Sequence, residues 1–244
     1  MAKLIEEERV PLSVAGLMQA RLDALNGSSE DLKNSWWNNY FDTGDGVLYH
    51  PDGNMKVVLG GQVFRDMTGD SSLYDGALVL GADKSSSIDT YDSIVGNGVT
   101  ELKRSNLDGL VNQRLSKEAV KSHPVWNALA PNDLLNDYVD AVFDFTGSEN
   151  NMGIWISSPK EKALGRLWCI GNHNRYSDAD NNYDLDDNSG RLVGVVPEAL
   201  SAQKGTVVSA KDIANSVNNY LNSRTISEGV TKKGLLQSIQ NCYK

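Results

Sequence analysis

The chain has 244 residues, of which 32 are acidic and 23 are basic, so its formal net charge is −9. Its contents of hydrophobic residues (40%) and charged residues (23%) are those of a globular protein and exclude a disordered chain. Nucleic acids and anionic membranes are bound through clustered Lys and Arg. The acidic balance therefore predicts no nucleic acid and no membrane as partners, and leaves open which protein or small molecule the chain binds.

The N-terminal region and the cysteines predict a soluble, cytoplasmic protein. Leu4 and Ile5 are followed by three glutamates, whereas a secretory signal needs about 7–15 apolar residues in a row. Apolar runs such as Ala77–Leu80 are much shorter than the roughly 20 residues of a membrane-spanning helix. Cys169 and Cys242 can form at most one bridge, so we expect two reduced thiols rather than a disulfide framework.

The first forty residues predict two helices joined by a short turn. From about Leu12 to Leu25, apolar residues at steps of three and four form one stripe. Asn26-Gly27 is a suitable C-terminal stop, and Ser28 or Ser29 can cap a second helix whose first turn is acidic. Two helices joined in this way should pack as an antiparallel hairpin.

The next segment predicts strands and turns. Val47–His50 and Met55–Leu59 flank the sequence PDGN, whose residues all suit a tight turn, so we expect a β-hairpin. We expect the preceding DTGDG, residues 42–46, to be a turn cluster. Two further strands are predicted at Gln62–Phe64 and Ala77–Leu80. The polar stretch Gly81–Arg104 is predicted to be a long loop.

The second half of the chain continues the mixture of helices and strands. Pro124 should break a helical stretch at Leu115–Leu129, and Asn132 or Asp133 should cap a longer helix. The remaining expected elements are the strands Met152–Ile156 and Leu164–Ile170, predicted to form a hairpin, the strand Arg191–Val196, and the helices Ala210–Leu221 and Val230–Cys242.

This order of elements predicts an α+β fold. We expect antiparallel β-hairpins that form a mixed or antiparallel sheet, helices at the N- and C-termini, and one helical segment in the middle. The whole chain, 1–244, is predicted to be a single domain, and the turn cluster near 145–151 is the one candidate for a weak subdivision.

An acidic loop at residues 176–190 is the strongest candidate for a metal site. Asp178, Asp180, Asp184 and Asp186, with Asn182 between them, offer the carboxylate and amide oxygens that Ca²⁺ prefers. The spacing is not that of an EF-hand, because Tyr and Ser stand where that loop needs Gly and Glu. The alternative is a solvated loop in which Asp and Asn favour turns.

Cys169, His50 and His173 are the residues from which a nucleophilic site could be built. A cysteine nucleophile needs a His within hydrogen-bond reach. On one strand Cys169 and His173 would lie roughly 13 Å apart, so His50 is the more open partner. The alternative is that Cys169 is a small core residue beside Trp168 and Ile170.

Two classes of function follow from these patterns. The first is a soluble, non-enzymatic binding or structural protein, with Ca²⁺ in the acidic loop as its candidate cofactor. The second is a hydrolase that uses Cys169 or a pair of carboxylates. The sequence contains neither a G-x-S-x-G motif nor a glycine-rich phosphate loop, so the first class is favoured.

Overall fold

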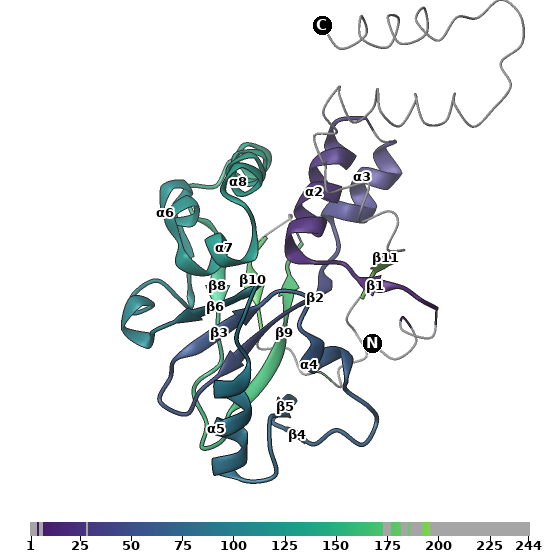
Figure 1. The fold of residues 1–244 in the computed structure, drawn as a ribbon. Helices are drawn as coiled ribbons and strands as arrows, with labels where there is room; N and C mark the ends of the chain where they lie inside the picture. Colours follow the sequence, from purple (N-terminus) through teal and green to yellow (C-terminus); the bar gives the residue numbers. More distant parts are fainter. Residues whose placement is uncertain are drawn as a thin grey trace, which may run out of the picture. The chain divides into compact units, whose positions relative to one another are not determined.

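The computed structural model describes residues 4, 7–27, 29–172, 177–181, 185 and 192–195. The internal contacts of the chain divide it into two units, Met1–Val196 and Pro197–Lys244. All of the described residues belong to the first unit. Helices and a mixed sheet alternate in this part (Figure 1), which confirms the α+β class. The helices expected at 210–221 and 230–242 lie outside the described residues, and the single domain over 1–244, with its weak subdivision near 145–151, stays a prediction.

A large sheet forms the centre of the described part. Its strands follow the order β6-β3-β2-β9-β10-β8-β7, with β5 also paired to β9 and β4 to β5. All pairs are antiparallel except β10 with β8, so the sheet is mixed as expected. The strand bounds are β2 Phe41–Tyr49, β3 Met55–Val58, β4 Leu73–Tyr74, β5 Ala77–Val79, β6 Val99–Leu102, β7 Gln113–Leu115, β8 Asn151–Trp155, β9 Leu164–Ile170 and β10 Ala179–Asp180.

A second, two-stranded sheet pairs β1 (Val10–Pro11) with β11 (Gly194–Val195). Of the strand predicted at 191–196, the described residues contain the two-residue strand β11, and Leu192 forms an isolated bridge to Asp42 of β2. Leu12, which lies between β1 and the first helix, is held by backbone hydrogen bonds on both sides. Its N donates to Val193 O, and its O accepts from Gly44 N in β2.

The helices lie at several points of the chain. Their bounds are α2 Val14–Leu25, α3 Glu30–Trp37, α4 Gln62–Arg65, α5 Lys84–Ser93, α6 Lys117–Ser122, α7 Pro124–Leu129 and α8 Asn132–Thr146, and a short 3₁₀ helix, η1, covers Arg104–Asn106. No helix in these ranges is long and apolar enough to cross a membrane. The predicted overall placement, with helices only at the termini and in the middle, is not confirmed, since α4 and α5 lie between strands.

A serine caps each helix of the N-terminal pair, and for the second helix the prediction of Ser28 or Ser29 is confirmed. The Ser13 hydroxyl accepts from Gly16 N, and the Ser29 hydroxyl accepts from Leu32 N at the start of α3. The interior of this pair contains a charge: Arg21 is fully buried and donates to Trp36 O, Asn39 O and Gly171 O and to the hydroxyl of Tyr138. Arg21 thereby ties α2 to the chain after α3, to α8 and to the end of β9.

The hairpin of β2 and β3 is confirmed, but β2 begins at Phe41, so residues 42–46 are part of a strand and not a turn cluster. The ring of Phe64 explains the glycine there. A Cβ atom on Gly46 would lie 2.1 Å from that ring, and one on Gly165 in the neighbouring strand would lie 3.1 Å from it. Asp45 is also needed, because its buried carboxylate accepts from Val14 N and Gly60 N.

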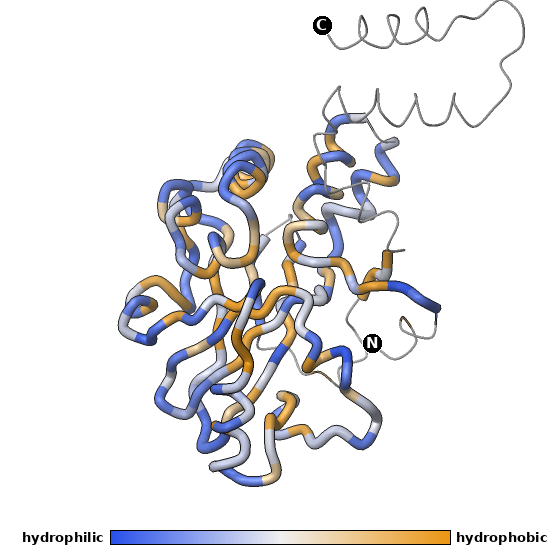
Figure 2. The backbone as a smooth tube through the Cα atoms, in the orientation of Figure 1, coloured by the Kyte–Doolittle hydropathy of each residue, from blue (hydrophilic) through white to orange (hydrophobic). Residues whose placement is uncertain are grey.

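The sheet is covered on both faces. Val57 belongs to the apolar cluster with α2 and α6–α8, and Val58 belongs to the cluster with Phe64 and Tyr91. The two valines therefore lie on opposite faces of the sheet, because successive residues of a strand point to opposite sides. Figure 2 shows the apolar residues along the central strands and hydrophilic residues along the outer connections.

Two segments between strands differ from the prediction. Gln62–Phe64 is the start of α4 and not a strand. The prediction was wrong because the periodicity of so short an apolar run cannot distinguish a helix from a strand. The loop predicted at 81–104 contains α5 and β6. A capping box of Asp83 and Ser86 starts α5, which buries only Ser87 and Tyr91 and so shows no apolar stripe in the sequence.

The hairpin predicted for β8 and β9 is wrong, because β10 lies between the two strands. Ala179 pairs with Ile154 on one side and with Ile170 on the other. The predicted break at Pro124 is correct, because α6 and α7 are separated at His123, but Leu115 belongs to β7. The predicted cap of the next helix is wrong: α8 is present, but its N-cap is Pro131, and Asn132 is its first residue.

Candidate functional site

Three connections meet at the end of the sheet where Tyr49 of β2 pairs with Leu164 of β9. They are the turn 50–54 between β2 and β3, residues 103–112 between β6 and β7, and residues 156–163 between β8 and β9. Together they enclose a pocket of about 60 Å³, which we call the loop pocket. Its lining residues are Gly53, Arg104, Leu107, Asp108, Val111, Asn112, Ile156, Ser157 and Ser158.

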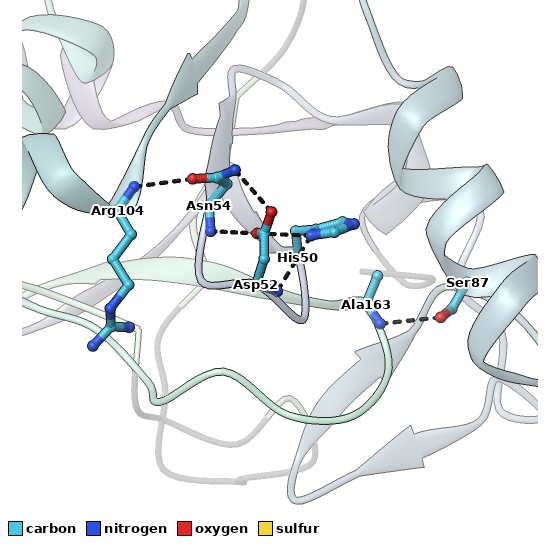
Figure 3. A network of polar contacts seen from close by, with 6 residues as sticks. All are labelled: His50, Asp52, Asn54, Ser87, Arg104 and Ala163. Atoms are coloured by element: carbon cyan, nitrogen blue, oxygen red, sulfur yellow. Dashed lines mark hydrogen bonds and ion pairs between the residues drawn. The ribbon is translucent and has the colours of Figure 1, made fainter.

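A chain of polar contacts fixes the first wall of the loop pocket (Figure 3). Nδ1 of His50 lies 2.7 Å from Oδ1 of Asp52, and the two Asp52 oxygens accept from the backbone and side-chain nitrogens of Asn54 at 2.9 and 3.0 Å. Oδ1 of Asn54 in turn accepts from the backbone N of Arg104 at 3.0 Å. The tight turn predicted from the sequence PDGN therefore sets the position of Arg104.

The side chain of Arg104 extends away from Asn54 and passes over Gly53. A Cβ atom on Gly53 would lie 2.5 Å from Cδ of Arg104, and its φ of +94° is one that L side chains rarely adopt. The positive φ favours glycine in this turn, and the lack of a side chain leaves room for the arginine. Within the described ranges, the Arg104 guanidinium has no ion pair or hydrogen bond.

Asn112 forms a second wall. Its φ is +59°, its backbone N donates to Ile154 O at 2.7 Å, and its Oδ1 accepts from Ile156 N at 2.9 Å. These contacts orient the amide, and its Nδ2 is left without an acceptor among the described residues. The third connection is anchored at its far end, where Ala163 N donates to the hydroxyl of Ser87 in α5 (Figure 3).

A buried network supports the pocket from behind. The Tyr49 hydroxyl donates to Oδ1 of Asn181 at 2.6 Å, and Ser157 N contacts both atoms at 3.2 and 3.3 Å. Burial raises the pKa of Tyr49, so this hydroxyl stays protonated and acts as a donor. Asn181 thereby joins the chain after β10 to the wall of the loop pocket.

Asp178, at the start of the acidic loop, has a structural role. Asp178 is 8% exposed, and its oxygens accept from Gly153 N at 2.6 Å and from Trp155 Nε1 at 2.9 Å. Burial raises the pKa of Asp178 to about 6, although these two hydrogen bonds oppose the shift. The carboxylate thus holds the chain before β10 against β8.

The calcium site predicted from the sequence is not visible as a cluster. Asp180 lies in β10, where it pairs with Cys169 and Trp155, while Asn182, Asp184 and Asp186 lie outside the described residues. Within the part that the structure describes, no three His, Cys, Asp or Glu side chains are close enough to hold a metal ion. Calcium binding by these five residues stays a prediction.

The structure does not bring Cys169 and His50 together. His50 follows Tyr49, which pairs with Leu164, and Leu164 is five residues from Cys169, or roughly 17 Å along a strand. Cys169 is buried, and burial raises the pKa of its thiol. It therefore has the character of a core residue, while His173 lies outside the described residues.

Sequence reasoning missed the residues of the loop pocket. The turn at 50–54 was visible, and it positions the site. Arg104 and Asn112 gave no signal, because an arginine or asparagine in a polar stretch looks the same whether it faces a pocket or bulk solvent.

Comparison with known proteins concerns the fold alone. No protein-family model and no curated protein matches the sequence. A solved structure described as "Accommodation of massive sequence variation in Nanoarchaeota by the C-type lectin fold" is similar, with a TM-score of 0.51. The fold of this chain is therefore similar to the C-type lectin fold. The match covers 79% of this chain and 87% of that one at 18% identity, so the C-type lectin-like fold carries over and the function of that protein does not.

Proposed function

We propose that this chain is a non-enzymatic binding protein, and that the loop pocket is the centre of its recognition surface. The observation that carries the proposal is the convergence of three connections on one polar pocket, where the Arg104 guanidinium and the Asn112 amide nitrogen have no partner among the described residues. Loops positioned by a rigid scaffold are the common location of binding residues.

The C-type lectin-like fold supports a division between scaffold and surface. The similar protein is described as a C-type lectin fold that accommodates massive sequence variation. In this chain the core consists of two apolar clusters on the sheet, and it includes the floor of the pocket, because Leu107 belongs to one cluster and Val111 and Ile156 pack against it. The polar pocket residues Arg104, Asp108 and Ser158 lie in connections outside both clusters. These polar side chains can therefore change with little effect on the core, which suits a binding protein better than an enzyme.

The hydrolase alternative has less support. The separation of Cys169 from His50 removes the Cys–His pair that the sequence favoured. A calcium ion in the acidic loop remains a second element of the proposal. Because Asp178 already accepts two hydrogen bonds, the main ligands would be Asp180, Asp184 and Asp186. A cytoplasmic location, and the lack of nucleic acid and membrane partners, stay predictions.

The proposed function can be tested by a ligand screen that compares the wild type with a variant whose pocket is blocked. Ligand-observed NMR would be recorded with organic acids, amino acids, monosaccharides and inorganic anions for the wild type and for Ser158→Trp, which places a large ring in the loop pocket. We expect at least one class to bind the wild type and Ser72→Trp, a change at an exposed serine outside the pocket, but not Ser158→Trp. Binding that is unaffected by Ser158→Trp, or no binding by any class, would overturn the proposal.

A further inference from the structure

We propose that the loop pocket takes a carboxylate carried on a small aliphatic group, with Arg104 as its anchor. This inference rests on the proposed function and specifies the chemical class of the ligand. It depends on four properties of the pocket: the unpaired cation, the excess of free donors, the acidic residue beside them, and the apolar floor.

Arg104 is an exposed basic residue without a carboxylate partner among the described residues. Acidic residues outnumber basic ones by 32 to 23, and Arg9, Lys117, Lys121 and Lys160 all form ion pairs with carboxylates. Arg104 has none in the described part, although its backbone is fixed by Asn54 and its stem crosses Gly53. A guanidinium presents a planar fork of donors that matches a carboxylate in a bidentate arrangement.

The other free polar groups of the pocket complete a set of donors. Oδ1 of Asn112 is occupied by Ile156 N, so the side chain can offer only its Nδ2 donors to a ligand. The hydroxyl of Ser158 has no partner among the described residues and can also donate. A ligand that accepts hydrogen bonds fits this set better than one that donates them.

Asp108 distinguishes between anions. It lines the same pocket as Arg104, and the two form no ion pair. One positive and one negative side chain leave the pocket close to neutral, so a second negative charge on the ligand would be repelled. A singly charged carboxylate is therefore favoured over doubly charged inorganic phosphate.

The floor of the pocket sets the size of the attached group. Leu107, which is 2% exposed, lies beside Val111 and Ile156 among the lining residues. The volume of about 60 Å³ is far below the roughly 300–1,000 Å³ of drug-sized sites. It suits the carboxylate with a few attached carbon atoms, as in a short-chain organic acid or the C-terminal residue of a peptide.

The test is an NMR titration of the full chain labelled with ¹⁵N. The probes are sodium propionate, N-acetylalanine as a mimic of a peptide C-terminus, the neutral amides of both, and inorganic phosphate. We expect one or both carboxylates to shift the resonances of Arg104 and Asn112, and the amides to bind at least 10-fold more weakly. Binding of propionate alone would identify a free organic acid, and binding of N-acetylalanine alone a peptide terminus.

Two charge variants and one control make the result specific. Arg104→Gln should weaken carboxylate binding by about 10- to 100-fold, as expected for a lost charge-assisted hydrogen bond. Lys103→Gln removes the same charge from the neighbouring exposed residue, which does not line the pocket, and should change the affinity less than twofold. Asp108→Asn should strengthen carboxylate binding several-fold and allow phosphate to bind.

The outcomes that contradict the inference are distinct from those that contradict the proposed function. Equal weakening by Arg104→Gln and Lys103→Gln, or equal binding of acids and amides, would overturn the carboxylate assignment. If neutral compounds bind in a manner that Ser158→Trp abolishes, the pocket still functions as a binding site. If no probe shifts a pocket resonance, and no compound of the wider screen depends on the pocket, both proposals are wrong.

Discussion

Two buried carboxyl groups should make this protein more stable in mild acid than at neutral pH. Burial raises the pKa of both Asp45 and Asp178 from 3.8 to about 6, in spite of two hydrogen bonds to each. A folded-state pKa above the unfolded value means that the folded protein holds these protons more tightly. Their contribution to stability is fully present below about pH 4 and is lost as the pH rises through about 6.

The size of the effect follows from the pKa change. A rise from 3.8 to about 6 corresponds to about 3 kcal/mol in the free energy of unfolding for each group. The carboxyl groups of the exposed Asp75 and Asp83 and of the half-buried Asp140 act in the opposite direction, because their ion pairs and hydrogen bonds lower the pKa. Their contribution is lost only below about pH 4, so we expect maximal stability between about pH 4 and 5.

Urea unfolding at half-unit steps from pH 4 to pH 7.5 measures this dependence. The wild type should lose several kcal/mol between pH 4.5 and 7, and Asp178→Asn should lose about half as much over the same range. Asp133→Asn, a change in the exposed first turn of α8, is the matched control and should leave the slope unchanged. A free energy of unfolding that is constant or rises from pH 4.5 to 7 would refute the reasoning.

Three further predictions concern other features. Arg21→Met should lower the free energy of unfolding by about 3–5 kcal/mol, because it leaves buried carbonyl groups without donors; a loss below about 1 kcal/mol in urea unfolding would contradict this. In a Cys242→Ser variant, the buried Cys169 should react with Ellman's reagent much more slowly in the native than in the urea-unfolded protein. Equal reaction rates would show that the Cys169 thiol is accessible in the native protein. If the acidic loop binds calcium, 1 mM Ca²⁺ should raise the Tm. For a Kd of about 10⁻⁵ M, the free energy of unfolding should increase by about 2.7 kcal/mol. Asp180→Asn combined with Asp184→Asn should abolish that gain, whereas an equal response to sodium at matched ionic strength would end the calcium hypothesis.

Much of the local structure could be predicted because it depends on neighbours in sequence. The apolar stripe of α2, the serine cap of α3, the PDGN turn and the break before Pro124 all appear in the structure. α5 could not be predicted from periodicity, since it is held by a capping box and buries only two side chains. β10 was missed because a two-residue strand is defined by its partners, which lie far away in the sequence.

The site was less predictable than the fold. The turn that positions Arg104 was recognised, but the pocket exists only where three connections meet in space. Asp178 was singled out for its negative charge, and the structure shows that charge directed inward, toward Gly153 and Trp155. A run of aspartates therefore contained at least one residue whose role is packing, which the spacing of the carboxylates did not reveal.

The position of β10 has a consequence for the order in which the protein folds. Among the strands that the structure describes, β7 and β8 are joined to the rest of the large sheet only through β10, which pairs with β8 on one side and β9 on the other. Until residues 179–180 are in place, β8 and β9 each present an open edge, and such edges favour association between chains. Because these contacts are late in the sequence, we expect closure of the sheet to be a late step of folding, and a nascent chain that ends before residue 179 to be prone to aggregation.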